Sequence, residues 1–168
     1  LLSNIFADPP QWDADGDGVL DNYNDYEYNG SLTAKIYTNG EEGGDVGDLI
    51  ATFVGDEQRG VGLASEVPIF LGGGIAFAMM IYSNETDGET LTFKYYSSSE
   101  DTVYDCNETL GWVINLVEGD VENPFQLTPN YSNICEDDSA CNIGQEGECI
   151  YPEANYDCSG NCVEDIDC

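Results

Sequence analysis

The sequence predicts an all-β protein, an antiparallel β-sandwich of about seven strands with an immunoglobulin-like or jelly-roll-like arrangement. Three observations predict this class. Apolar and polar residues alternate with a period of two through the middle of the chain, as in half-buried strands. Turn residues, among them many of the 19 glycines, separate these segments. Hydrophobic residues make up 41% of the 168 residues, which suffices for the core of one ordinary domain.

The chain divides into four segments of different composition. The first is an apolar N-terminal arm, the second an aspartate-rich loop, the third a strand-rich region, and the fourth a small cysteine-rich appendix. Their boundaries are residues 1–12, 13–25, 26–130 and 131–168. We therefore expect one β domain that carries a short extension at each end.

The expected strands follow from the alternation and from the turns between them. They cover residues 32–36, 49–54, 60–64, 75–82, 90–96, 102–106 and 125–128. Residues 49–54 (LIATFV) are apolar on both faces, which predicts a central strand. The turn sequence NETDGE predicts a hairpin between the strands on either side of it. Residues 107–117 are the one segment expected to hold a short helix.

The arm begins with LLSNIFAD, which is apolar and able to form a strand. Leu2 and Phe6 lie on one face of such a strand, and Leu1 and Ile5 lie near the other. Two prolines follow, so the arm cannot easily fold back as a hairpin. One interpretation is that the arm adds a strand to the sheet of an identical subunit. The alternative is a free terminus or the end of a preceding strand.

The charge balance is extremely acidic. Only Lys35, Arg59 and Lys94 oppose 34 carboxylates, and the net charge is −31. Such a surface repels nucleic acids and anionic lipids, and no apolar run approaches the roughly 20 residues of a membrane helix. Divalent cations can neutralise the excess, or it can simply keep a secreted protein soluble. Arg59, beside Asp56 and Glu57, is expected to make a structural ion pair and not to bind a ligand.

The strongest motif is the aspartate-rich loop DADGDGVLD, which begins at residue 13. Carboxylates at loop positions 1, 3, 5 and 9, with glycine at position 6, match the spacing of calcium-binding loops. Position 12 is Asn24, where an EF-hand has a glutamate, and Asp25 next to it can take that role. The alternative is a solvated acidic linker. The expected ligands of a structural Ca²⁺ are Asp13, Asp15, Asp17, the Val19 carbonyl, Asp21, Asn24 and Asp25.

Six of the seven cysteines lie in the last 34 residues. The chain has no histidine and no C-x-x-C pair, so disulfides in an oxidising compartment are expected in place of a zinc site. Cys106 stands apart and either pairs with the tail, joins another chain or stays free. The cysteines considered for disulfides are Cys106, Cys135, Cys141, Cys149, Cys158, Cys162 and Cys168.

Two further patterns bear on function. Asn-x-Ser/Thr sequons predict N-glycosylation of a secreted or cell-surface protein at Asn29, Asn84, Asn107 and Asn130. Catalytic patterns are poor, because histidine is absent, Cys106 has no histidine base, and no pair of carboxylates stands out. We therefore expect a protein that is not an enzyme.

Three ordered motifs carry a resemblance to a class of secreted proteins. They are DLIATFVGDEQRGVG, GETLTFKYYSSSEDTVYD and ENPFQLT, and together they span about 100 residues. They resemble motifs of β-sandwich domains in secreted multidomain bacterial proteins, which often carry Cys-rich repeats similar to ACNIGQEGECIYPEANYDCSGNC. The aspartate loop resembles the structural calcium repeats of dockerins and thrombospondin type 3 segments. The architecture resembles subunits of glycosylated, pilus-like extracellular filaments.

The resemblance implies a structural role outside the cell. The first hypothesis is a calcium-stabilised, glycosylated subunit that polymerises head-to-tail with identical subunits by donating its N-terminal arm. The second is a carbohydrate-binding or adhesive module of a larger secreted protein.

Overall fold

The structure is a computed structural model, and it describes residues 10–131, 139–141, 150–152 and 156–159. The chain separates into two compact units, Leu1–Asn130 and Tyr131–Cys168. The expected assembly arm, with Leu1, Leu2, Ile5 and Phe6, lies outside the described residues, and the strands belong to the first unit.

The described residues form nine strands and two short 3-10 turns, with no α-helix among them. The turns are η1 (Tyr23–Asp25), before the first strand, and η2 (Ile69–Leu71), between the fourth and fifth. The strands are β1 (Tyr28–Thr38), β2 (Glu41–Gly43), β3 (Leu49–Val54), β4 (Glu57–Glu66), β5 (Ile75–Ser83), β6 (Asp87–Ser97), β7 (Thr102–Val113), β8 (Val117–Glu118) and β9 (Phe125–Leu127).

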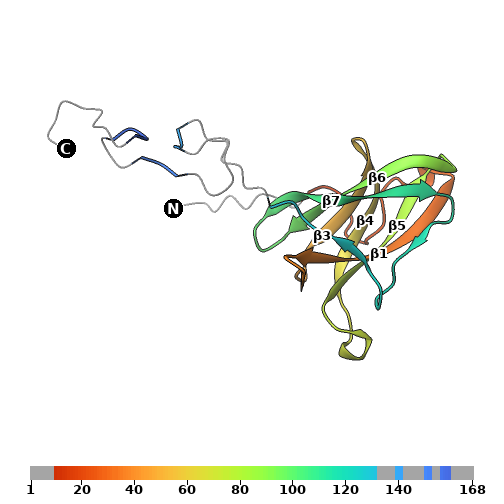
Figure 1. Ribbon diagram of the computed structural model, residues 1–168. Helices are drawn as coiled ribbons and strands as arrows, with labels where there is room; N and C mark the ends of the chain where they lie inside the picture. The colour runs from red at the N-terminus through yellow and green to blue at the C-terminus, as the bar shows by residue number, and fades with distance from the viewer. Residues whose placement is uncertain (1–9, 132–138, 142–149, 153–155, 160–168) are drawn as a thin grey trace. The chain divides into compact units, whose positions relative to one another are not determined.

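The strands form one continuous, strongly curled sheet in the order β2-β1-β5-β4-β3-β6-β7 (Figure 1). This confirms the all-β, mainly antiparallel class. The sheet is continuous because β4 pairs along most of its length with β3 and, over its last three residues, with β5. As expected, β3 is central: β4 and β6 flank it, and residues 50–53 are all buried.

The two sides of the curled sheet are linked by the segment that contains β9. This strand pairs in parallel with β1, in the register Ala34↔Phe125 and Ile36↔Leu127. Directly after it, Pro129 bridges Cys106 of β7. The Asn107 N–H also donates to the Thr128 carbonyl, at 3.0 Å. A three-residue strand thus joins β1 to β7, which lie far apart in the order of the sheet.

The core fills the inside of the curl. Alternate residues of β1 and β5 point into it, as the period of two predicts, and they meet side chains of β3, β6 and β7. Gly60 and Gly62 of β4 allow a close crossing over β5: a Cβ at Gly60 would lie 2.5 Å from the Met80 carbonyl oxygen. The buried cluster contains Leu32, Ala34, Ile36, Ile50, Phe77, Met79, Ile81, Leu91, Phe93, Tyr95, Trp112 and Leu127.

Two local expectations were wrong. The NETDGE turn does not make a hairpin, because β1 and β4 occupy the two edges of β5 and β6 pairs instead with β3 and β7. The segment expected to be helical continues β7 to Val113. Its residues alternate between exposed and less exposed, with Leu110 and Trp112 on the inner side, and this spacing suits a strand better than a helix.

The second unit contains the Cys141–Cys158 disulfide, with an S–S distance of 2.06 Å. This confirms a disulfide in the cysteine-rich tail. The other four tail cysteines, Cys135, Cys149, Cys162 and Cys168, lie outside the described residues. Cys106 of β7 carries a free thiol in this structure.

Among the described residues, no helix has the length and apolar character that a membrane crossing requires.

Candidate functional site

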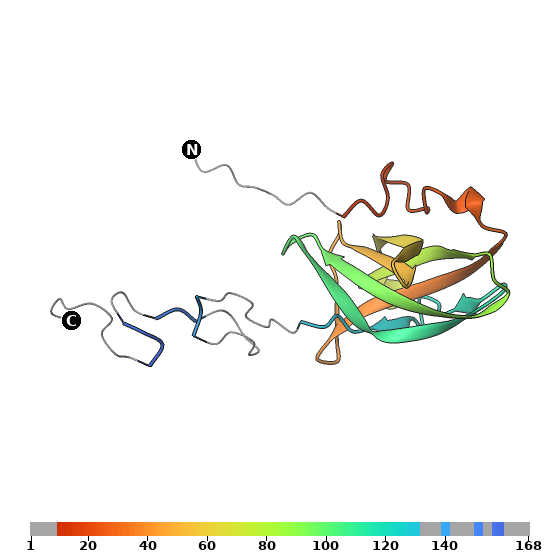
Figure 2. The ribbon, with the colours of Figure 1, turned by 90° about the horizontal axis from the view of Figure 1, so that it is seen from above.

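The aspartate-rich loop lies along the outside of the curled sheet, where Figure 2 shows it as the red segment after residue 10. Three of its carboxylates, those of Asp13, Asp15 and Asp21, place oxygen atoms within 4.8 Å of one another. Ligand oxygens on opposite sides of a Ca²⁺ ion are about 4.6–5.2 Å apart, because each Ca–O distance is about 2.3–2.6 Å. The three carboxylates can therefore share one ion of this size.

The loop is shaped by hydrogen bonds to its own aspartates. The Gly16 N–H donates to Asp13 Oδ1 at 2.9 Å, and the Gly18 N–H donates to Asp13 Oδ2 at 2.7 Å. Both glycines have positive φ, 74° and 79°, which a residue with a side chain adopts only at a cost. The glycines thus allow the sharp bend, and Asp13 at loop position 1 holds it closed.

The two other predicted carboxylate ligands do not belong to this group. Asp17 is not part of the three-carboxylate group, and its Oδ1 accepts the N–H of Val19 at 2.8 Å. Asn24 and Asp25 belong to η1, and the Asp25 carboxylate is not in the group either. Of the five predicted carboxylate ligands, three thus meet at one centre.

Repulsion within the loop is visible at Asp15. A hydrogen bond from the Asp17 N–H lowers the pKa of the Asp15 carboxyl. Desolvation, the negative charge of Asp17, a side-chain hydrogen bond with Asp13 and the charge of Asp13 together outweigh this bond, so the pKa of Asp15 is raised above its usual value. A bound cation would relieve this repulsion.

The loop is docked on the sheet at its entrance and its middle. Gln58 of β4 donates from Nε2 to the Trp12 carbonyl at 2.7 Å, and the Trp12 ring meets Phe53 edge-on at 6.1 Å. Leu20 is buried, and a Cβ at Gly18 would lie 3.3 Å from the Leu63 side chain. These contacts fix the first part of the loop against β3 and β4.

The exit of the loop is also fixed. The Asn84 side chain accepts the Glu27 N–H at 2.8 Å and donates from Nδ2 to the Asp25 carbonyl at 3.1 Å. The Tyr26 hydroxyl donates to Glu57 at 2.8 Å. Because both ends are held, the loop is part of the folded unit and not a free linker.

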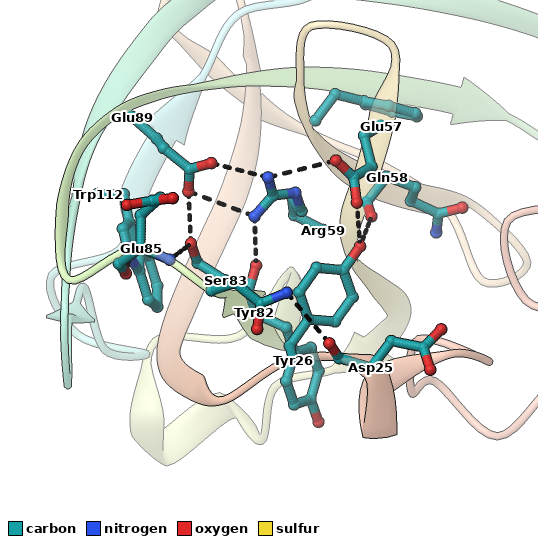
Figure 3. A network of polar contacts seen from close by, with 12 residues as sticks. Asp25, Tyr26, Glu57, Gln58, Arg59, Tyr82, Ser83, Glu85, Glu89 and Trp112 are labelled. Carbon is teal, nitrogen blue, oxygen red and sulfur yellow. Dashed lines mark hydrogen bonds and ion pairs between the residues drawn. The ribbon is translucent and has the colours of Figure 1, made fainter.

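Beside the exit lies a buried polar network around Arg59, drawn in Figure 3. Arg59 is 6% exposed and donates to both oxygens of Glu89, at 2.7 and 3.3 Å. It also donates to the Tyr82 carbonyl at 3.3 Å, and its guanidinium lies over the Tyr26 ring, 5.2 Å from the centroid. The structural role expected for Arg59 is observed, but with Glu89 as its closest partner, a residue 30 positions away that local sequence could not indicate.

The network extends to the core tryptophan. The Ser83 hydroxyl donates to Glu89 at 2.5 Å and accepts the Glu85 N–H at 2.9 Å. Trp112 Nε1 donates to the Glu85 carbonyl at 2.7 Å. This continuous network positions the segment after β5, which includes Asn84, and thereby the exit of the aspartate loop.

The chain has no cationic side chain left for the loop. Its three cations each pair elsewhere: Lys35 with Glu42, Arg59 with Glu89 and Glu57, and Lys94 with Asp105. Since histidine is absent, neutralisation of Asp13, Asp15 and Asp21 has to come from solvent ions or from a bound metal.

All four predicted glycosylation sites, Asn29, Asn84, Asn107 and Asn130, are exposed. They are not equivalent, because the Asn84 amide nitrogen, to which a glycan would attach, already donates to Asp25. Comparisons with protein-family models, with curated proteins and with solved structures found no match for this chain.

Proposed function

We propose that this chain is a non-catalytic structural subunit of an extracellular or cell-surface filament, rigidified by Ca²⁺ in the aspartate loop and N-glycosylated. The observation that carries the proposal is the convergence of Asp13, Asp15 and Asp21 in a docked loop to which no cation of the chain is available. Hard carboxylate oxygens at this spacing suit Ca²⁺. The ion would stiffen the loop that connects the arm to the sheet.

In this proposal the curled sheet acts as a compact sandwich. Strands β1 and β5 form one layer, and β3, β6 and β7 form the other. The layers pack through contacts such as the edge-on pair of Phe77 and Tyr95, 6.5 Å apart. Such a unit needs no partner to bury its core, which suits a repeated building block.

Assembly is assigned to the arm, residues 1–8, as a strand donated to an identical subunit. Each backbone hydrogen bond made by an added strand contributes a net ~0.5–1.5 kcal/mol. Burial of Leu2, Ile5 and Phe6 contributes ~1.5–3 kcal/mol per side chain. Ordering the arm offsets part of this gain, and Ca²⁺ at its exit would reduce that cost. A donated arm makes a heterologous contact, so the product is an open filament.

Sedimentation velocity and negative-stain imaging test this proposal. The intact chain is expected to polymerise when Ca²⁺ is present, and a variant lacking residues 1–8 is expected to remain a folded monomer. Polymerisation of the truncated variant would refute arm donation. An intact chain that stays monomeric at high concentration with Ca²⁺ would refute the filament altogether.

A second candidate, a carbohydrate-binding or adhesive module, has one observation in its favour. Tyr23 is 44% exposed and lies 5.8 Å from Tyr82, which in turn lies 6.3 Å from Tyr26, all beside the aspartate loop. Exposed aromatic rings can stack on sugars. Retention of the monomer on immobilised glycans, lost in Tyr23→Ala, would support this candidate over the filament.

A further inference from the structure

The connection between β4 and β5 presents two large apolar side chains to solvent. Ile69 is 93% exposed and Phe70 is 85% exposed, both in η2. In Figure 1 this yellow-green connection projects from the lower end of the sheet. A contiguous apolar tip of this kind usually marks an interaction site. We call residues 68–71 the apolar tip.

The tip is preorganised. The Leu71 N–H donates to the Pro68 carbonyl at 2.8 Å, and the Val67 N–H donates to the Gly74 carbonyl at 2.9 Å. Lys35, which is only 3% exposed, donates from Nζ to the Gly73 carbonyl at 3.0 Å and pairs with Glu42. A tip already held by a buried lysine loses little conformational entropy when it binds.

A hollow of about 240 Å³ lies on the outer face of β1 and β5. Met80, one of its lining residues, is 37% exposed. A cavity of roughly 150 Å³ can accept a benzene-sized ring, so the volume suits a phenyl group. Gly18 of the aspartate loop forms part of the wall, together with Ser31, Leu32, Thr33, Ala78, Met79 and Met80.

Charge indicates what occupies this hollow. No charged residue lies between Glu66 and Glu85, a stretch that contains both the tip and the β5 side of the hollow. The β1 side, residues 28–34, is also uncharged. Two copies that each carry a charge of −31 repel one another, so they approach most closely through uncharged surface, and an ion in the aspartate loop would offset the charge beside Gly18.

We propose that Phe70 of one copy inserts into the hollow between β1 and β5 of a second copy. Tip and hollow are different patches of one molecule, so the contact is heterologous and compatible with an open assembly, in which it adds to the arm contact and is too weak to hold two copies together alone. The contact deepens the proposed filament and rests on it, but it does not involve the N-terminal arm. Because Gly18 lines the hollow, an ion bound in the aspartate loop would also stabilise the receiving surface.

Site-specific cross-linking tests the contact in the full chain. Benzoylphenylalanine replaces Phe70 in an equimolar mixture of isotope-labelled and unlabelled protein with Ca²⁺. The benzophenone group reacts readily with methionine, and the side chain of Met80 is exposed in the hollow. We expect cross-linked peptides of mixed isotope content that join position 70 to residues 78–80. The same cross-linker at Val103, which is 43% exposed on β7, serves as the control.

Two variants measure the energetic effect. Phe70→Ser removes the inserted ring, and Ala78→Glu places a charge in the hollow. Each is expected to weaken self-association roughly 10- to 100-fold. Val103→Ser should leave self-association unchanged. Cross-links to another surface, or equal weakening by Val103→Ser, would overturn the contact while leaving the filament proposal intact.

Two other outcomes are also decisive. If the unmodified chain never self-associates, both the filament and this contact are wrong. If Phe70 instead makes the chain float with phosphatidylcholine vesicles, and Phe70→Ser abolishes flotation, the tip binds a lipid surface and not a second copy.

Discussion

The aspartate loop and the Arg59 network lie side by side, and they deal with negative charge in opposite ways. In the network, a buried guanidinium neutralises Glu89 at 2.7 Å, and Ser83 also donates to this carboxylate. In the loop, Asp13, Asp15 and Asp21 converge without a cation and accept hydrogen bonds from backbone N–H groups. The difference shows where this acidic chain pairs its carboxylates with its own cations and where it leaves them without one.

Two further acidic groups avoid an unpaired negative charge in other ways. Asp48 is 1% exposed, and without a cation its carboxylate accepts hydrogen bonds from Tyr95, Ser98 and the Asp45 N–H, at 2.5 to 2.8 Å. Cys106 keeps its proton. Burial, and then the charges of Glu108 and Asp105, raise the pKa of this thiol to about 12. These different environments predict different responses of the free energy of unfolding to mutation or pH.

The largest effect is expected at Arg59. In Arg59→Met the carboxylate of Glu89, whose side chain is only 14% exposed, loses its cation, so we expect a loss of ~3–5 kcal/mol in the free energy of unfolding. Urea denaturation followed by Trp112 fluorescence measures it. Addition of Glu89→Gln should restore part of the loss.

Lys94→Met is the matched control, because its pair with Asp105 is exposed and contributes ~0–1 kcal/mol. Equal losses for Arg59→Met and Lys94→Met would mean that the network gives no more stability than a surface pair.

A smaller effect is expected at Asp48. Asp48→Asn replaces an accepting oxygen with an amide that donates, which leaves a buried donor unpaired and costs ~1–3 kcal/mol. Denaturant unfolding compares it with Asp45→Asn, an exposed site where the expected change is within ~0.5 kcal/mol. An unchanged midpoint for Asp48→Asn would show that the carboxylate charge is not needed there.

At neutral pH the smallest effect on stability is expected at Cys106, and this effect appears only as the pH rises. The folded state holds the thiol proton more tightly than the unfolded chain, so this contribution is complete below pH ~8.5 and is lost as the pH rises towards 12. At pH 8 the thiolate fraction is about 1000-fold lower than in an ordinary cysteine. Mass spectrometry after alkylation should find Cys106 modified slowly when folded and rapidly in urea.

In Cys106→Ala the free energy of unfolding should fall less between pH 9 and 10, before the tyrosines titrate, than in the unmodified protein. Prompt alkylation of Cys106 in the folded protein would contradict the burial argument.

The parts of the fold that the sequence could predict are those governed by local periodicity. The alternation in β1 and the two-sided apolar pattern of β3 identified these strands because burial imposes a period of two on the residues. The pairing of β5 and β6 was wrong because partner choice depends on strands distant in sequence. The parallel pairing of β1 with β8 and β9 also left no local pattern.

The same limit applies to the site. Spacing alone predicted that Asp13, Asp15 and Asp21 converge, since the side chains of a short loop are placed by local geometry. The hydrogen bonds from Gln58 to Trp12 and from Asn84 to Asp25 join residues 46 and 59 positions apart, so the local sequence did not indicate them. The sequence predicted Asn84 only as a glycosylation site, although its amide also holds the exit of the loop through a hydrogen bond to Asp25.

Melting of the protein with Ca²⁺ and with chelator tests the central claim most directly. Binding to the folded state alone adds about 2.7 kcal/mol at a hundredfold excess over Kd, which raises Tm by roughly 5–10 °C. Asp15→Asn should abolish this increment, whereas Asp56→Asn, an exposed carboxylate outside the loop, should preserve it. Identical melting curves with Ca²⁺ and with chelator, or a full increment in Asp15→Asn, would contradict a calcium site in the aspartate loop.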